Sequence, residues 1–303
     1  MSALFERMAI IGLGLIGSSV ARVVRQHGIA DHISVCARSS ETRQAATDLG
    51  LADAVFADPA EAVADADFVL LCTPLGTYKT LAEAFAPSLK PGAIVSDVGS
   101  VKGSAIRDVG PFMPDGVTFV PGHPVAGTEN SGPHSGFAEL FARRWCILTP
   151  PDGTDENAVN TVADFWREAG SEIEIMDAAH HDLVLAVTSH LPHLIAYNIV
   201  GTADDLAKVT ESEVIKFAAG GFRDFTRIAA SDPVMWRDIF LTNRDAVLEM
   251  LGRFTEDLSA LQKAIRYKDG EKLEALFTRT RHIRREVIDA GQADPDEAPE
   301  DTY

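Results

Sequence analysis

Basic residues, cysteines and long apolar runs are all scarce in this chain of 303 residues. Lys and Arg number 27 against 45 Asp and Glu, and the net charge of −18 excludes polyanions as natural partners, because nucleic acid and anionic membranes would be repelled over most of the surface. No run reaches the roughly 18 apolar residues of a membrane span, and the amino terminus lacks a basic region followed by an apolar stretch. We therefore expect a cytoplasmic protein with no membrane partner.

The three cysteines, Cys36, Cys72 and Cys146, lie far apart in apolar runs. Their spacing suits neither a disulfide framework nor a metal site, and a small, scattered set is typical of a reducing cytosol. Apolar residues make up 46% of the chain and charged residues 24%, as in globular proteins. At about 150 residues per domain, the length predicts two domains.

Short β-branched runs alternate with amphipathic stretches over residues 1–176. This alternation predicts an α/β domain, a Rossmann-type doubly wound sheet of parallel strands whose two faces are both covered by helices. The expected strands are Met8–Ile11, Ile33–Ala37, Phe68–Cys72, Ile94–Val98, Thr118–Val120, Trp145–Thr149 and Glu172–Met176. The expected helices include Ser18–Gln26, Ser40–Leu49, Thr77–Phe85 and Glu156–Glu168.

Residues 177–291 contain helical patterns only, and predict an all-helical domain. Asp177–Val200 is apolar almost all round, whereas Asp232–Tyr267 and Glu271–Ile288 each carry an apolar seam that needs a partner helix. One small domain cannot bury this much apolar surface, which favours a homodimer formed through the helical domain. Residues 292–303 hold five acids and no base, and are expected to be a disordered acidic tail.

A glycine motif of the form G-x-G-x-x-G follows the first expected strand directly and opens a helix. Gly12 would make the tight turn, Gly14 would let the backbone approach a pyrophosphate, and Gly17 would allow close packing of helix on strand. Leu15 and Ile16 lie within the motif and would border the cofactor, and the N-terminus of the helix offers unpaired N–H groups and a positive dipole end that favour phosphate. The motif predicts a nicotinamide dinucleotide, NAD or NADP, as cofactor.

The second expected strand ends in Arg38, Ser39 and Ser40, without the carboxylate that usually holds the ribose hydroxyls of NAD. A guanidinium beside two hydroxyls suits a 2′-phosphate, which favours NADP. In the alternative interpretation, Arg38 is a solvated loop residue and backbone groups hold NAD.

Ligands of open α/β sheets lie beyond the carboxyl ends of the strands, so residues that follow three neighbouring expected strands should meet in one crevice. Thr73 and Pro74 follow the strand that begins at Phe68 and would border the cofactor. His123 follows the strand Thr118–Val120, between a glycine and a proline that restrict its backbone, which favours a role in proton transfer. Ser100, after the strand that begins at Ile94, is positioned to hydrogen-bond the same substrate oxygen, to cap a helix, or both.

Two clusters stand out in the helical domain. Ser189, His190 and His193 surround Pro192, which should kink its helix, and we interpret the histidines as lining a pocket rather than as purely structural groups. Arg223 and Arg227, four residues apart, predict an anion receptor for carboxylates, with surface salt bridges as the alternative. No further ligands lie near enough in sequence to predict a metal site.

Five separated motifs together closely resemble the prephenate/arogenate (cyclohexadienyl) dehydrogenase family over residues 8–290. They are GLGLIGSS, DVGSVKGS, PGHPVAGTENSG, TSHLPH and GFRDFTRIAASDPVMWRDIF. The resemblance implies a Rossmann domain joined to a helical dimerisation domain. It also implies oxidative decarboxylation of prephenate or arogenate, a cyclohexadienyl dicarboxylate, with hydride transfer to NAD(P)⁺ in tyrosine biosynthesis.

By motif position, the resemblance implies His123 as the catalytic histidine and Ser100 as its partner at the substrate hydroxyl. Arg227 would be the main carboxylate clamp, and Glu129 would lie at the pocket mouth. The remaining residues that would line the substrate site are Ser189, His190, His193 and Arg223.

Two alternatives remain at this point. A β-hydroxyacid dehydrogenase would resemble a family with a catalytic lysine in the helical domain, but Lys208 and Lys216 lie outside any such motif. A non-catalytic, nucleotide-sensing dimer would not need His123, Ser100 and two arginines to converge on one site.

Overall fold

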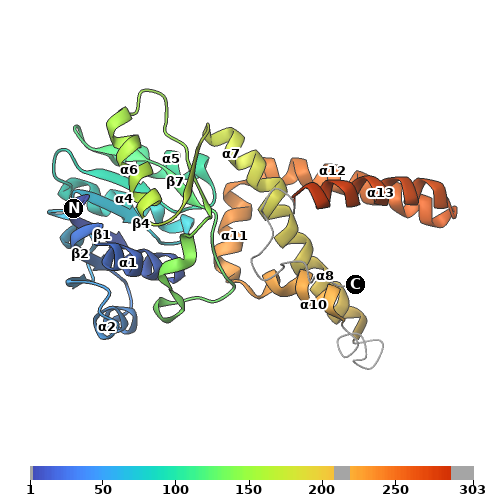
Figure 1. The fold of residues 1–303 in the computed structure, drawn as a ribbon, viewed down its shortest axis with the longest axis horizontal. Coiled ribbons are helices and arrows are strands. Elements are labelled where there is room, and N and C mark those ends of the chain that lie inside the picture. Colours follow the sequence, from blue (N-terminus) through green and yellow to red (C-terminus); the bar gives the residue numbers. More distant parts are fainter. Residues whose placement is uncertain (1–2, 208–218, 288–303) are drawn as a thin grey trace, which may run out of the picture. The chain divides into compact units, whose positions relative to one another are not determined.

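The computed structural model describes residues 3–207 and 219–287. Residues 5–120 contain a parallel sheet of six strands, of which β1, β2 and β4 are labelled in Figure 1. The strand order is β3-β2-β1-β4-β5-β6, the arrangement of the dinucleotide-binding doubly wound fold. This confirms the predicted fold class. The strands are β1 (Phe5–Ile11), β2 (Ala30–Cys36), β3 (Ala54–Phe56), β4 (Phe68–Leu71), β5 (Ile94–Asp97) and β6 (Thr118–Val120).

Helices cover both faces of this sheet. They are α1 (Leu15–His27), α2 (Ser40–Asp48), α3 (Pro59–Val63), α4 (Tyr78–Phe85), α5 (Lys102–Val109) and α6 (Glu156–Glu168). Side chains of α1 and α6 build one apolar core, and those of α3, α4 and α5 build the other. All four residues of β4 are buried, with Phe68 in the first core and Val69 in the second, as expected for a strand covered on both sides.

The last two expected strands do not join the parallel sheet, contrary to the prediction. β8 (Trp145–Leu148) and β9 (Glu172–Ile175) form a second sheet with β7 (Gly122–Pro124), in which β7 and β8 are antiparallel. The change of sheet occurs at Pro121, between β6 and β7, where the carbonyl of Pro121 accepts a hydrogen bond from Thr149 N. His123 therefore lies in a strand, not in the loop that we expected.

The helical part begins with one long segment, which consists of α7 (Ala178–Leu185), a π-helical turn (Ala186–His190) and α8 (Leu191–Ala207). The π turn ends two residues before Pro192, which has no N–H to continue the regular hydrogen-bond pattern, so the helix is irregular next to the position where a kink was predicted. By length and composition alone, Ala178–Asp205 would also suit a membrane span, a test that core helices of soluble proteins pass as well.

The remaining helices are α10 (Gly220–Thr226), α11 (Pro233–Thr242), α12 (Arg244–Arg266) and α13 (Gly270–Val287). The predicted helix over Asp232–Tyr267 is thus interrupted at Asn243. Asp232 caps α11 by accepting from Val234 N and Met235 N, and Pro233 is the first helical residue.

The chain separates into two compact units, residues 1–247 and 248–303. All the site residues named above lie in the first unit, and α13 lies in the second. The predicted acidic tail and Ile288, the end of the last predicted helix, lie outside the described residues, as do Lys208 and Lys216.

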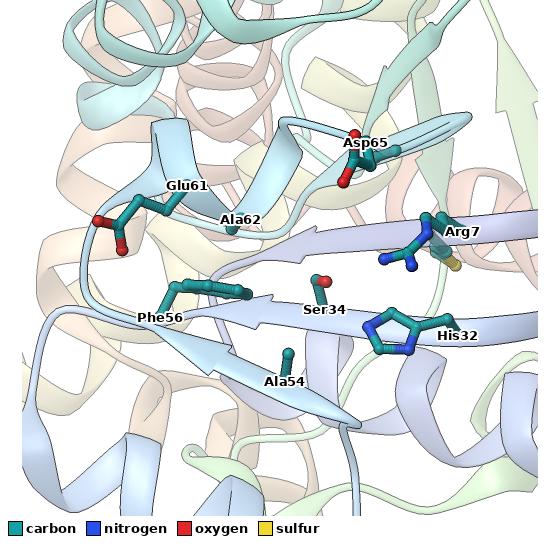
Figure 2. Close-up of a pocket in the computed structure, with 10 residues that line it drawn as sticks. Arg7, His32, Ser34, Ala54, Phe56, Glu61, Ala62 and Asp65 are labelled. Carbon is teal, nitrogen blue, oxygen red and sulfur yellow. The ribbon is translucent and has the colours of Figure 1, made fainter.

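A cavity of about 270 Å³ lies between β1, β2, β3 and α3 (Figure 2). Arg7, His32 and Ser34 border it along β1 and β2, and Phe56 and Asp65 lie toward β3 and α3. None of its lining residues belongs to the predicted cofactor or substrate site.

Candidate active site

The first turn of the fold leaves no room for side chains at two of the three motif glycines. Gly12 has a φ of +98°, and a Cβ there would lie 2.8 Å from the carbonyl oxygen of Cys72 and 2.6 Å from Cγ2 of Thr73. A Cβ on Gly17 would collide with the carbonyl oxygen of Gly12. These two glycines are therefore required by the protein's own packing, and Thr73 lies directly against the turn.

Gly14 differs, because a Cβ there would meet no atom within 4 Å. It precedes Leu15 and Ile16 as the N-cap of α1, where no side chain caps the helix and no acidic residue lies in the first turn. Open space beside unpaired N–H groups fits the pyrophosphate of a dinucleotide. Pro74, which follows Thr73 after β4, opens the short turn Leu75–Thr77.

Of the residues after β2, Ser39 has a structural role and Arg38 is exposed to solvent. The Ser39 hydroxyl caps α2, since it accepts from Thr42 N at 3.1 Å and donates to Thr42 Oγ1 at 2.9 Å. Arg43 donates to the carbonyl oxygens of Ala37 and Arg38 and so braces the loop. The Arg38 side chain is exposed and makes no hydrogen bond or ion pair with the described residues, which leaves its guanidinium available to an anion.

His123 is buried in β7 and belongs to a chain of three side chains. Its Nδ1 lies 2.8 Å from Nε2 of His181, and Nδ1 of His181 lies 2.8 Å from Oδ1 of Asp182. His181 and Asp182 come from α7, so the helical part contacts His123 directly. His181 is fully buried.

Asp182 also caps α5, because its Oδ1 accepts from Lys102 N at 2.7 Å and its Oδ2 accepts from Gly103 N at 2.9 Å. Ser100 was the predicted candidate for this cap, and that part of the prediction is wrong. The N-cap position is Val101, and no side chain from that strand-to-helix loop makes the cap. A carboxylate from a distant helix satisfies the amides instead, which leaves the Ser100 hydroxyl without a capping role.

A buried ion pair lies beneath β7. Lys102 Nζ donates to Asp97 Oδ2 at 2.6 Å and to the carbonyl oxygen of Gly122, and both charged side chains are fully buried. Asp97 also accepts from Gly99 N at 2.8 Å and from Gly122 N at 3.2 Å. The pair therefore fixes the residue that precedes His123 through both its N–H and its carbonyl group.

Burial holds these imidazoles neutral. Desolvation lowers the pKa of His123 well below its usual value, and the neighbouring His181, Lys102 and His190 lower it further. Desolvation also lowers the pKa of His181, although the hydrogen bond to Asp182 opposes that shift. At neutral pH, His123 is thus in the form that accepts a proton.

The predicted histidine pair of the helical part is held around Trp236. The His193 ring stacks on Trp236 with ring centroids 3.6 Å apart, and its Nδ1 lies 2.9 Å from the carbonyl oxygen of Ser189. Asn243 Nδ2 donates to the carbonyl oxygen of Asp182 at 2.8 Å and lies 3.0 Å from Nδ1 of His190. An amide N–H that donates to Nδ1 places the His190 proton on Nε2.

That Nε2 atom of His190 is buried and has no hydrogen-bond partner in the described chain. Burial lowers the pKa of His190 to about 4, so it too stays neutral. A buried donor without an acceptor is costly, and a ligand oxygen would satisfy it. The predicted pocket role of His190 would supply such an oxygen.

Arg227 forms a surface salt bridge, the alternative that the sequence left open beside an anion receptor. Arg227 Nη1 lies 2.8 Å from Oε2 of Glu129, an ion pair that joins the segment after β7 to the helical part. Arg223 is exposed in α10, whereas Arg227 begins a 3-10 turn, so the two do not share one regular helix as expected. The turn ends just before the Asp232 cap of the next helix.

Two family profiles match most of the chain. Residues 20–175 match the nucleotide-binding domain of prephenate dehydrogenase, and residues 177–279 match its dimerization domain. The chain is 45% identical to a cyclohexadienyl dehydrogenase of Zymomonas mobilis over 280 residues, which are 92% of this chain and 95% of that one. The chain belongs to the prephenate/arogenate dehydrogenase family.

Solved structures of this family have the same fold as this chain. A prephenate dehydrogenase from Aquifex aeolicus, in complex with hydroxyphenyl propionate and NAD⁺, has a TM-score of 0.87 and 35% identity over 93% of this chain and 98% of that one. An arogenate dehydrogenase from Synechocystis has a TM-score of 0.77 and 27% identity over 93% and 99% of the two chains. The predicted family and its dehydrogenase activity in tyrosine biosynthesis are confirmed at this level.

Several residues of this dehydrogenase site were missed by sequence reasoning. His181 and Asp182 begin a largely apolar helix, where polar side chains need partners, and this was the available signal. Lys102 lies inside the DVGSVKGS motif, but the residues next to it in the sequence do not indicate that it is buried. No local sequence pattern indicates the roles of Asn243 and Trp236, because the residues that they contact lie some 40–60 positions away in sequence.

Proposed function

We propose that this dehydrogenase converts prephenate and arogenate by oxidative decarboxylation, with His123 as the proton acceptor. The observation that carries the proposal is the buried, neutral His123, which lies on β7 against α7 of the helical part. A bound nicotinamide would accept a hydride from the ring carbon that bears the hydroxyl group. The protein's own task is then to orient the substrate and to take the hydroxyl proton.

His123 withdraws the hydroxyl proton as the C–O bond becomes a carbonyl. When the ring carboxylate leaves as carbon dioxide, its bonding electrons complete the aromatic ring and the oxygen regains a proton. His123 is therefore charged only transiently, and its low basicity suffices because aromatisation drives the step. Ser100 would donate to or accept from the same oxygen, and its freedom from a capping role supports this assignment.

The substrate carries two carboxylates, and we assign their main contact to Arg227. The Arg227 guanidinium now pairs with Glu129, and a substrate carboxylate would replace or share that partner. Arg223, His193 and Ser189 would border the same space, and the orphaned Nε2–H of His190 would donate to a substrate oxygen.

The cofactor would bind at the open turn of Gly12, Gly14 and Gly17, bordered by Thr73. Arg38 favours the 2′-phosphate of NADP⁺, because its guanidinium is exposed and unpaired among the described residues.

We expect Arg38→Asp to lower kcat/KM for NADP⁺ relative to NAD⁺ by about tenfold or more, the usual value of one charge-assisted contact. An unchanged ratio would show that Arg38 does not select the nucleotide.

We also infer a cytoplasmic homodimer built through the helical domain. The dimerization-domain match and the exposed apolar side chains of α8, α12 and α13 support the dimer.

The deciding experiment is a spectrophotometric assay of reduced nucleotide with four substrate pairs: prephenate or arogenate, each with NAD⁺ or NADP⁺. Product analysis should show carbon dioxide with 4-hydroxyphenylpyruvate from prephenate and tyrosine from arogenate. Reduction of nucleotide with neither compound, by protein shown to be folded, would overturn the proposal. Turnover of a β-hydroxyacid instead would favour the alternative dehydrogenase class.

A further inference from the structure

We propose that His181 and Asp182 are positioning residues that hold the proton of neutral His123 on Nδ1 and leave Nε2 as the atom that accepts the substrate proton. The catalytic consequence rests on the proposed function, whereas the proton positions rest on hydrogen-bond geometry alone. Neither residue would touch the substrate.

The first step concerns Asp182, which is an acceptor at both oxygens. Its Oδ1 and Oδ2 accept the backbone N–H groups of Lys102 and Gly103, so the carboxylate orientation is fixed from a second direction. Nδ1 of His181, 2.8 Å from the same Oδ1, must therefore carry a hydrogen. This is the common arrangement in which a carboxylate selects one imidazole tautomer.

The second step follows from the two facing ring nitrogens. His181 is fully buried and neutral, so a proton on its Nδ1 leaves its Nε2 as a bare acceptor. Nδ1 of His123 lies 2.8 Å from that nitrogen, and two lone pairs at this distance would repel one another. The hydrogen between them must come from His123 Nδ1, which leaves Nε2 of His123 with its lone pair free.

The third step concerns charge after proton transfer. The His123 imidazolium would keep its Nδ1–H bond to His181, and the Asp182 carboxylate lies at the far end of the same chain of hydrogen bonds. The other ionisable groups around His123 are the Lys102–Asp97 pair, His190 and Cys146. Lys102 opposes the new positive charge and Asp97 offsets it, so Asp182 is the carboxylate that reaches His123 through its hydrogen-bonded partner.

The kinetic test compares two variants of His181. Phenylalanine removes the acceptor from His123 Nδ1, and we expect His181→Phe to lower kcat by about 10²-fold, the lower end of the contribution of a general base. Glutamine keeps an acceptor oxygen on a side chain of similar reach, so His181→Gln should stay within about tenfold of the unchanged enzyme. His180→Phe, at the exposed neighbouring position, is the matched control and should be unaffected.

The decisive readout is the ¹⁵N chemical shift of the His123 ring nitrogens, assigned by comparison with His123→Asn. We expect a protonated Nδ1 and an unprotonated Nε2 in the unchanged protein and in His181→Gln, and loss of that preference in His181→Phe. Thermal unfolding of each variant shows whether it is folded, and a structural role alone would lower the midpoint without moving the tautomer.

A protonated Nε2 in the unchanged protein would overturn the proposal, as would equal losses of kcat in folded Phe and Gln variants. Absence of turnover by the unchanged protein would instead refute the proposed function, and the nitrogen shifts would still decide the proton positions.

Discussion

Three buried histidines of this site stay neutral for one physical reason, which is that a buried imidazolium loses its hydration. His123, His181 and His190 all have a lowered pKa with desolvation as the main cause. For His123 the fixed charge of Lys102 acts in the same direction. Burial therefore keeps His123 neutral but makes it a weaker base. A weak base suffices for the proposed reaction, because aromatisation of the substrate ring supplies the driving force.

This predicts how activity depends on acidity. A base with a lowered pKa remains neutral until the pH falls below that lowered value, so kcat/KM should stay level from neutral pH to well below 6.5. The measurement is kcat/KM for prephenate against pH, with circular dichroism at each pH to confirm that the protein is folded. An acid limb centred at or above pH 6.5 would contradict the burial argument.

His123→Asn removes the base while keeping a polar side chain of similar size. We expect kcat to fall by about 10²–10⁴-fold, the usual contribution of a positioned acid–base group, with a smaller change in KM. His180→Asn, on the exposed side of α7, serves as the control. Full activity of His123→Asn would remove this residue from the mechanism.

Arg227→Ala should raise KM for the substrate far more than it lowers kcat, because it removes binding shared by substrate and transition state. A charge-assisted contact contributes about 1.5–3 kcal/mol, which corresponds to a rise in KM of roughly 10–100-fold. Arg244→Ala is a suitable control, since Arg244 is exposed and paired with the neighbouring Asp245. An unchanged KM in Arg227→Ala would mean that another group holds the carboxylate.

The expected strand Thr118–Val120 made His123, which follows it, a candidate from the sequence, whereas the residues that contact His123 gave no comparable signal. His181 is linked to His123 across 58 positions, and Asn243 to His190 across 53. Single-sequence patterns report on neighbours within a few residues. The same limit hid the role of Asp182 as the cap of α5, which local reasoning offered only as an alternative role for Ser100.

At the scale of elements, the glycine turn between β1 and α1 separates packing from ligand binding. Gly12 and Gly17 are demanded by the fold, because any Cβ there strikes backbone atoms. Gly14 faces open space and adopts a backbone conformation that alanine tolerates, with a φ of −82°. Of the three glycines, only Gly14 leaves open space for a ligand.

Gly14→Ala should therefore fold normally and yet bind dinucleotide poorly, since the added methyl group would occupy the approach to the pyrophosphate. We expect KM for the nucleotide to rise by about tenfold or more, in line with the cost of a misplaced contact, and the unfolding midpoint to stay within a few degrees. Gly12→Ala is the contrasting variant, which should be clearly less stable. A Gly14→Ala protein with unchanged nucleotide KM would place the phosphates elsewhere.

Elements with an apolar or β-branched pattern were predictable, whereas β7, which lacks one, was not. The expected helix Glu156–Glu168 matches α6 at both ends, and the expected strand Thr118–Val120 matches β6. β7 is three residues long and consists of glycine, histidine and proline, none of which indicates a strand. Its formation depends on pairing with β8, a tertiary contact that overrides local preference.

At the scale of the whole molecule, exposed large apolar side chains are concentrated in the described helical part. Most of the exposed large apolar side chains follow residue 177, among them Val187, Ile199, Leu258 and Phe277. Surfaces of this kind mark interaction sites. The match to a dimerization domain identifies a second copy of this chain as the expected partner.

Replacing apolar residues of the second unit by acids should therefore dissociate the protein. In the double variant Leu258→Glu/Phe277→Glu, each copy would place two carboxylates in an apolar interface. Each unpaired buried charge has an effective cost of several kcal/mol. We therefore expect the dissociation constant of the dimer to rise by at least about 10²-fold. Sedimentation should show a change from twice the 32.6 kDa of one chain to that mass itself. Leu4→Glu/Ile175→Glu alters comparably exposed apolar residues of the nucleotide-binding part and should remain dimeric. If the first variant also remained dimeric at micromolar concentration, the interface would have to be formed by other helices, with α8 as the next surface to alter.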